Sequence, residues 1–198
     1  MDSFYKKQLD ILSSKKLFNK LSNKPLDNIL RGIEKENIRM DYKLGIPTKT
    51  SHPVKLGSTL TNEYITTDFS ENLLECITPP VKGRIELFQQ LQDITIFINK
   101  VLSDKDKSKD KNKDINKEFL WSYSMPYLPS KDSVNDIYIG YYGNNNLGKM
   151  KSVYREGLVN RYGKAMQLIA GLHYNFSFPE QILLELGPLP GAKLDTRY

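Results

Sequence analysis

Two segments of this chain alternate like β-strands and yet carry several carboxylates. Residues 31–36 read RGIEKE and residues 64–75 read YITTDFSENLLE. Among their acids are Glu34, Glu36, Asp68 and Glu75. Residues two apart in a strand point to the same face, so Glu34 and Glu36 are expected side by side. Burying two anions together costs several kcal/mol unless a cation compensates them. A bound divalent metal is the simplest compensation.

Length and composition fit one globular domain, or one lobe of a larger one. The 198 residues are 39% hydrophobic, which can supply a core. The net charge of +6 comes from 29 basic and 23 acidic residues. Many lysines fall near the N-terminus and in one low-complexity run, which is not a nucleic-acid footprint. A single cysteine, Cys76, excludes an internal disulfide and fits the cytoplasm. We expect no membrane span and no signal peptide.

Hydrophobic periodicity predicts three helices. They cover residues 4–22, residues 83–102, and residues 152–170 with a start near Lys149 or Ser152. In the last helix, an apolar stripe from Tyr154 to Ile169 is expected to pack on an apolar surface. Gly171 is expected to end that helix.

Period-two alternation predicts four strands. They cover residues 31–40, 63–68, 72–78 and 173–178. Residues 69–77 also match the helix period, which leaves a helix as the alternative there. In the last strand His173, Asn175 and Ser177 share one face, and the aromatic residues between them are expected in the core. A lone strand histidine is more often structural than catalytic, but its polar neighbours leave both interpretations open.

Two further segments read as loops. Residues 103–118 hold six lysines, four aspartates and one glutamate, with Ile115 as the one apolar residue. We expect a solvated, disordered insertion there rather than a nucleic-acid-binding tail. Residues 140–148 form a turn rich in Gly and Asn before a helix, where free N–H groups can hold an anion. Their pattern is not a phosphate-loop consensus.

Seven motifs, taken in this order, resemble the proteobacterial type of glutamate-cysteine ligase. They are residues 31–36 (RGIEKE), 65–69 (ITTDF), 73–79 (LLECITP), 124–126 (SMP), 154–158 (YREGL), 160–163 (NRYG) and 171–177 (GLHYNFS). The resemblance runs over residues 20–178 and is interrupted by the Lys/Asp-rich insertion. It implies an α+β fold with a partial glutamine synthetase-like antiparallel sheet, one half of a funnel, and flanking helices.

The resemblance implies an ATP-dependent ligase of glutathione synthesis. In this family ATP phosphorylates the γ-carboxylate of L-glutamate, and the amine of L-cysteine attacks the γ-glutamyl phosphate to give γ-glutamylcysteine. Phosphoryl transfer depends on positioning and on cations that neutralise phosphate oxygens, so carboxylates that hold Mg²⁺ or Mn²⁺ match the reaction. The implied partners are these small molecules, with neither nucleic acid nor membrane, and the implied location is the cytoplasm.

The metal ligands carry over by position. The acids that match the family's metal-binding residues are Glu34, Glu36, Asp68 and Glu75. No catalytic residue is expected beyond this metal site. The alternative is that Glu34 pairs with Arg31 or Arg39 while the other acids are solvated.

Substrate-binding residues also carry over. The positions that match the lining of the pocket for the cysteine side chain are Tyr154, Leu158 and Gln167. Ile169 and His173 match the region that receives glutamate. Arg155 can place a positive charge near a substrate carboxylate or a phosphate, or be merely solvated. For the apolar residues of the helix, ordinary core packing is the alternative.

The later part of the chain departs from the family, which is much longer. The missing part supplies further strands, another metal-binding glutamate and arginines for glutamate and nucleotide. Residues 1–178 are therefore expected to be the N-terminal part of a ligase catalytic domain, and residues 179–198 a divergent tail. Such a chain exposes sheet edges and an apolar face. The alternatives are a non-catalytic remnant, a module that only binds metal or nucleotide, and a ligase that uses another amine.

Overall fold

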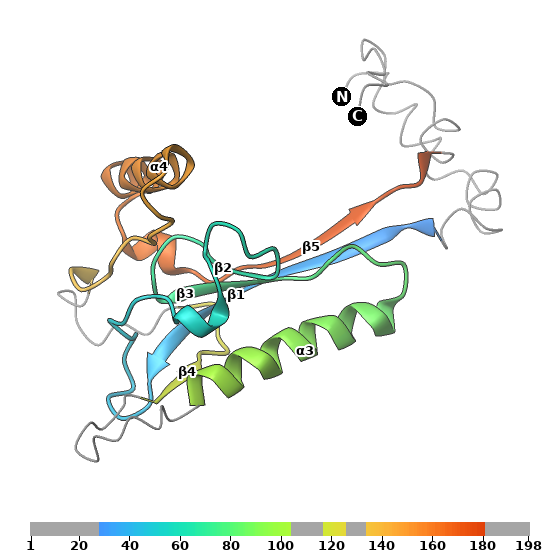
Figure 1. The fold of residues 1–198 in the computed structure, drawn as a ribbon, viewed down its shortest axis with the longest axis horizontal. Coiled ribbons are helices and arrows are strands. Elements are labelled where there is room, and N and C mark those ends of the chain that lie inside the picture. The colour runs from blue at the N-terminus through green and yellow to red at the C-terminus, as the bar shows by residue number, and fades with distance from the viewer. Residues whose placement is uncertain (1–27, 104–116, 126–133, 181–198) are drawn as a thin grey trace, which may run out of the picture.

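The computed structural model describes residues 28–103, 117–125 and 134–180 (Figure 1). The predicted helix at 4–22 and most of the predicted insertion lie outside these residues. In chain order the elements are β1 (Leu30–Asp41), the short 3₁₀ helix η2 (Val54–Leu56), β2 (Ile65–Thr67), β3 (Leu73–Ile77), α3 (Arg84–Ser103), β4 (Glu118–Leu120), α4 (Asn146–Tyr162), the 3₁₀ helix η4 (Ala165–Leu168) and β5 (Leu172–Ser177). None of the described helices is long and apolar enough to cross a membrane.

The strands form one antiparallel sheet in the order β2-β3-β1-β4, and β5 pairs with the first half of β1. Each predicted strand is present within a few residues of its expected bounds, and the fold is α+β as predicted. The helical alternative at residues 69–77 is wrong, because residues 73–77 pair with both β1 and β2. Ladder hydrogen bonds on both edges hold this segment extended.

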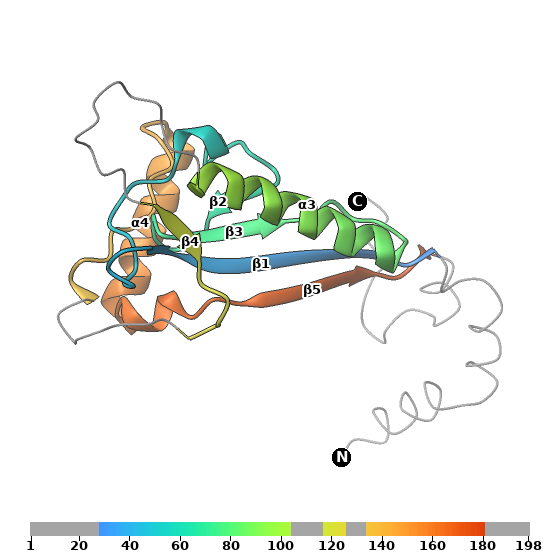
Figure 2. The ribbon, with the colours of Figure 1, turned by 90° about the horizontal axis from the view of Figure 1, so that it is seen from below.

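Each face of the sheet carries its own hydrophobic cluster. Helix α3, which matches the predicted helix at 83–102, runs along one face (Figure 2). The cluster under α3 consists of Leu56, Ile65, Leu74, Cys76, Ile98 and Leu102. The cluster on the opposite face consists of Ile38, Met40, Phe69, Leu73, Ile137, Leu168 and Ala170. Glu34 and Glu36 share strand parity with Ile38 and Met40, so they lie on the face away from α3.

The helix predicted at 152–170 is shifted toward the N-terminus. It begins at Asn146, because the side chain of Asn145 accepts a hydrogen bond from the Gly148 amide at 2.7 Å and caps the first turn. It ends at Tyr162, because Gly163 adopts a φ of 78° that L-residues rarely take. The prediction that Gly171 ends this helix is wrong. The helical spacing of the apolar residues beyond Gly163 comes from η4, which follows as a separate turn.

The predicted packing of this helix is also largely wrong. Tyr154, Met166 and Ile169 are exposed, and only Leu158 of the stripe packs against the cluster around Met40. Figure 1 shows α3 on one side of the sheet and α4 on the other, near one end. Helix α4 therefore meets the sheet cluster through Leu158 and Val159, while the buried Gly148 permits close approach of its first turn to the backbone of Tyr142 and Gly143.

The strand β5 lies where the sequence predicts it, but its aromatic face is not core. All six residues are exposed, and Phe176 is 58% exposed. Among the described residues β5 pairs with β1 alone, and Tyr174 on its aromatic side is 50% exposed. The alternation correctly predicts a strand, but it does not reveal which faces are covered.

Two glycines of α4 give a matched test of this packing. A Cβ on Gly148 would lie 2.5 Å from the carbonyl oxygens of Tyr142 and Gly143, whereas a Cβ on Gly157 meets nothing within 4 Å. We expect Gly148→Ala to lower the free energy of unfolding by about 1–3 kcal/mol, as overpacking does. Gly157→Ala is expected to raise it by up to about 1 kcal/mol. Urea denaturation measures both, and equal effects would contradict the packing described above.

Candidate functional site

The sheet register brings the predicted acids together. Glu36 of β1 lies opposite Glu75 of β3, and Glu34 lies opposite His173 of β5. Thr66 of β2 lies opposite Glu75 on the other side, and Asp68 follows the end of β2 directly. Three strands thus present acids and one histidine on the face away from α3. The sequence predicted the strands, and their pairing makes the cluster.

Each of the two β1 acids accepts a hydrogen bond from the β5 segment. The Asn175 side-chain amide donates to Glu34 at 2.8 Å, and Nδ1 of His173 lies 3.3 Å from the other Glu34 oxygen. The backbone N–H of Gly171 donates to Glu36 at 2.7 Å. The alternative that Glu34 pairs with Arg31 or Arg39 is therefore wrong. The guanidinium of Arg31 instead donates to the carbonyl oxygens of Ile29 and Lys82.

Burial and the neighbouring acids raise the pKa of Glu36 and of Glu75. Burial, followed by the charges of Asp68, Glu34 and Glu36, raises the pKa of Glu75 to about 7. Burial also raises the pKa of Glu36, partly offset by the hydrogen bond from Gly171. On the exposed side, the hydrogen bond to Glu34 raises the pKa of His173. The face therefore concentrates negative charge near neutral pH.

The acids are close enough to repel one another without forming a complete metal cage. In the described part of the chain, no group of three or more His, Cys, Asp or Glu side chains is arranged to hold a metal ion. Their oxygen ligands suit Mg²⁺, which is commonly bound by one or two carboxylates together with water and substrate phosphates. The pair Glu36 and Glu75, directly opposite in the sheet, offers such a partial shell.

Among the predicted substrate residues, His173 lies on the acid face formed by Glu34, Glu36, Asp68 and Glu75, and Arg155 contacts the backbone of that face at Asp68. Its Nε donates to the backbone carbonyl of Asp68, and its Nη1 donates to the Lys151 carbonyl at 3.0 Å. Arg155 is thus not merely solvated. Tyr154 and Ile169 are exposed, and Gln167 is half-buried.

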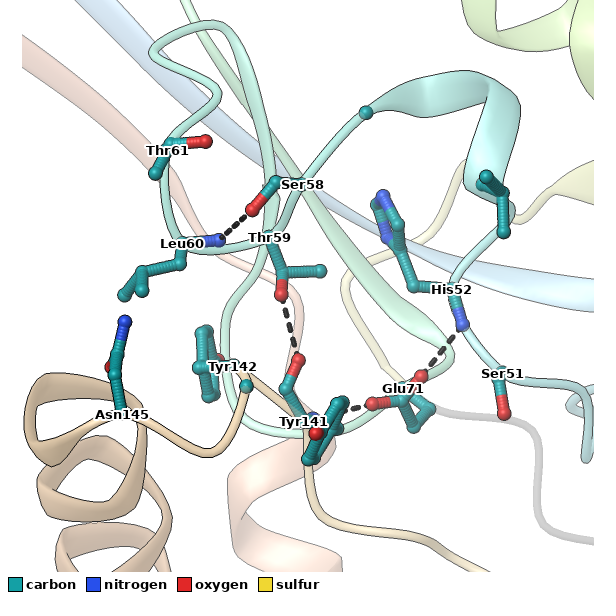
Figure 3. A pocket seen from close by; sticks show the side chains of 13 residues that line it. Ser51, His52, Ser58, Thr59, Leu60, Thr61, Glu71, Tyr141, Tyr142 and Asn145 are labelled. Atoms are coloured by element: carbon teal, nitrogen blue, oxygen red, sulfur yellow. Dashed lines mark hydrogen bonds between the residues drawn. The ribbon is translucent and has the colours of Figure 1, made fainter.

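A cavity of about 710 Å³ lies elsewhere, between the residue 51–61 loop and the turn before α4 (Figure 3). None of the predicted site residues lines it. Glu71 lines this cavity. Its carboxylate accepts hydrogen bonds from the backbone N–H of His52, at 2.6 Å, and from the backbone N–H of Tyr141. Glu71 therefore joins the two loops at the cavity.

Sequence reasoning missed three residues that shape the site. Asn175 shares a face with His173, and this alternation was the signal for its contact with Glu34. Tyr142 and Glu71 make long-range contacts to backbone atoms, and no local pattern announces them. Such contacts become visible only once the fold places the loops side by side.

The two histidines of the chain give a test of the site's electrostatics. The pKa of His173 is raised by Glu34, whereas burial lowers the pKa of His52. We expect two ring-proton NMR titrations, one above and one below the ordinary value of 6.5. Glu34→Gln should lower the higher pKa and leave the other unchanged. A pair of superimposed titrations would contradict the Glu34 contact.

The comparisons with known proteins place these motifs in one family. The family model described as glutamate-cysteine ligase matches residues 15–194. A glutamate-cysteine ligase of Saccharophagus degradans is 48% identical over 155 residues, which are 78% of this chain and 26% of that protein. One from Bordetella bronchiseptica is 41% identical over 176 residues, 87% of this chain and 30% of that protein. The chain thus spans between a quarter and a third of these relatives' length.

Solved structures agree with this. The glutamate-cysteine ligase of Francisella tularensis in complex with AMP superimposes with a TM-score of 0.68 at 40% identity, over 80% of this chain and 29% of that one. A bifunctional glutathione synthetase from Pasteurella multocida gives 0.66 at 28% identity, over 91% of this chain and 21% of that one. With the family model matching nearly the whole sequence, the chain belongs to the glutamate-cysteine ligase family.

Proposed function

We propose that the chain carries the acid face of a glutamate-cysteine ligase, which joins the γ-carboxyl of L-glutamate to the amine of L-cysteine at the expense of ATP. One observation carries the proposal. The acids that match the family's metal ligands come from two separate segments, residues 31–36 and 64–75, and the register of β1 with β3 gathers them on one face, beside His173 of β5. A structural role is a poor explanation for this, because like charges opposite one another destabilise a sheet.

The residues of this face fit a divalent cation. Glu36 and Glu75 would hold Mg²⁺, and Glu34 and Asp68 would complete or share the site. When bound, such a cation neutralises phosphate oxygens during phosphoryl transfer. Its charge would also offset the burial and the repulsion that together raise the pKa of Glu75. The oxygen-only donor set argues for Mg²⁺ or Mn²⁺ rather than zinc.

The other residues would orient the substrates. Arg155 offers a cation beside Asp68 that can face a substrate carboxylate or phosphate. His173, which contacts Glu34, is proposed to face glutamate, and the hydrogen bond to Glu34 raises its pKa. Tyr154, Leu158 and Gln167 are proposed to line the cysteine pocket, with Ile169 toward glutamate.

A cytoplasmic setting fits the chain's one thiol. Cys76 is free and buried under α3, and burial raises its pKa to about 11. A buried, protonated thiol is unreactive. We therefore assign the Cys76 side chain no role in the reaction, whose L-cysteine is a free substrate.

Two measurements on the purified chain test the proposal. The first is ATP-dependent formation of γ-glutamylcysteine with Mg²⁺, glutamate and cysteine, and the second is the affinity for Mn²⁺. Glu36→Gln is the informative variant, because the amide oxygen can still accept the Gly171 hydrogen bond while the charge is lost. Glu63→Gln, at an exposed position outside the cluster, is the control.

We expect the unsubstituted chain to bind Mn²⁺ and to form product. Glu36→Gln should weaken both, and Glu63→Gln should leave both unchanged. Metal binding without product would favour the alternative of a metal-binding module that needs a further part of a longer enzyme. A folded chain with neither property would overturn the proposal.

A further inference from the structure

The backbone carbonyl of Asp68 joins two parts of the site. It accepts a hydrogen bond from the Tyr142 hydroxyl at 2.6 Å and another from Nε of Arg155. The same hydroxyl lies 2.7 Å from the Thr67 carbonyl and accepts from the Thr67 side chain at 3.2 Å. A phenol has one proton, so Tyr142 shares it between the two carbonyls. Through these bonds the buried Tyr142 side chain holds the backbone at the end of β2, at the residue that carries the Asp68 carboxylate.

The ring of Tyr142 also supports Arg155 directly. The guanidinium carbon lies 4.3 Å from the ring centroid, and Nζ of Lys151 lies 4.9 Å from it. Both distances are within the range of a cation–π interaction. Tyr142 is 2% exposed, and burial raises its pKa to about 12, so the hydroxyl stays protonated. At neutral pH it therefore acts as a hydrogen-bond donor.

The backbone around Tyr142 has little freedom to move. A Cβ on Gly140 would lie 3.0 Å from the Tyr142 hydroxyl, so this glycine permits the ring to approach. The next residue, Tyr141, accepts from the Thr59 side chain at 2.7 Å through its carbonyl and donates its N–H to Glu71 (Figure 3). Helix α4 presses Gly148 against the Tyr142 carbonyl. The position of the hydroxyl is thus fixed from several sides.

We propose that Tyr142 is a positioning residue: it holds Asp68 of the acid face and the guanidinium of Arg155 in fixed positions relative to each other. Its hydroxyl sets the peptide plane at Asp68, and its ring holds the guanidinium that bonds to the same carbonyl. This inference rests on the proposed function, in which Asp68 helps to hold a divalent cation and Arg155 faces a substrate anion. A substitution at Tyr142 should consequently weaken cation binding and displace the Arg155 guanidinium, although Tyr142 itself would contact neither the cation nor the substrate.

Two substitutions separate the hydroxyl from the ring. Tyr142→Phe keeps the ring under Arg155 and removes the shared donor, whereas Tyr142→Leu removes both. Tyr141→Phe is the control, because Tyr141 is 58% exposed and engages its neighbours through backbone atoms. The readouts on the full chain are Mn²⁺ affinity by EPR and the NMR signal of the Arg155 Nε–H. The thermal midpoint of unfolding reports the fold of each variant.

We expect Tyr142→Phe to weaken Mn²⁺ binding by about three- to ten-fold, since one neutral hydrogen bond is lost. Its Arg155 Nε–H signal should keep the upfield ring-current shift but change its exchange rate with solvent. In Tyr142→Leu the shift should vanish as well. Tyr141→Phe should leave both readouts at the values of the unsubstituted chain.

Unchanged Mn²⁺ affinity and an unchanged Arg155 signal in folded Tyr142→Phe would overturn the inference. If Tyr142→Leu does not fold, the comparison of Tyr142→Phe with Tyr141→Phe still decides. Absence of Mn²⁺ binding in the unsubstituted chain would overturn the metal part of the proposed function. In that case the Arg155 signal alone decides whether Tyr142 positions the guanidinium.

Discussion

Arg39→Met is expected to lower the free energy of unfolding by about 3–5 kcal/mol, because it removes one partner of a buried ion pair. The Arg39 side chain is 0% exposed and lies 2.6 Å from Glu118. The guanidinium further donates to the Thr50 side chain and to the carbonyls of Thr50, Ser51 and Glu71 at 2.8–3.1 Å. Methionine fills the volume but leaves the buried Glu118 without its cationic partner, with only the hydroxyls of Thr48 and Thr50 still donating to it. It also removes the guanidinium donor from these carbonyls.

The control is the exposed pair of Lys49 and Asp136, whose side chains are 51% and 50% exposed and 2.8 Å apart. Lys49→Met is expected to change the free energy of unfolding by less than about 1 kcal/mol, because exposed pairs contribute little. Urea denaturation followed by circular dichroism measures both variants. Equal losses in the two would mean that Arg39 does not join β1 to the residue 50–51 loop and to β4.

The ion pair of Arg39 with Glu118 shows why the end of the loop predicted at residues 103–118 was misplaced. Glu118 closes the Lys/Asp-rich run and was expected in its solvated loop, but it begins β4 and is buried against Arg39. Ser103, at the other end of that run, is the last residue of α3. Composition averages over a segment, whereas a partner far away in the sequence decides whether one acid is buried. Residue 39 offered no local sign of that partner.

The acid face was predictable for a different reason. Alternation in the β1 and β3 segments predicts strands, and the presence of acids among apolar residues indicates a functional surface. The contacts of Arg155 with Asp68 were not predictable, since they depend on where α4 starts and how closely it packs. The exposure of Phe176 was likewise not predictable, because a periodic pattern fixes a side chain's face and not what covers that face.

Glu75→Gln is expected to stabilise the metal-free chain at pH 8 while weakening its binding of Mn²⁺. The folded-state pKa of Glu75 is about 7 against its ordinary value of 4.5. The folded chain therefore holds this proton more tightly than the unfolded chain does. The associated stability is present below about pH 4.5 and is lost as the pH rises to about 7. A permanently neutral glutamine keeps that stability at high pH.

The full shift would correspond to about 3 kcal/mol, and solvent screening at this half-buried carboxyl reduces the expected gain to about 1 kcal/mol. At pH 4 the variant and the unsubstituted chain should unfold at the same urea concentration. Metal binding should respond in the opposite sense, because a cation must displace the proton from Glu75. In the unsubstituted chain Mn²⁺ affinity should fall by about ten-fold per pH unit below pH 7.

The two effects together distinguish a metal site from a structural acid. If Glu75 served the fold, its replacement would destabilise the chain at pH 8, and Mn²⁺ would bind as before. If it serves as a ligand, the chain carries a destabilising charge that only a bound cation offsets. Glu63→Gln should show neither effect, since it is exposed and outside the cluster. A Glu75→Gln variant that loses stability at pH 8 would contradict the acid face as a site kept for binding.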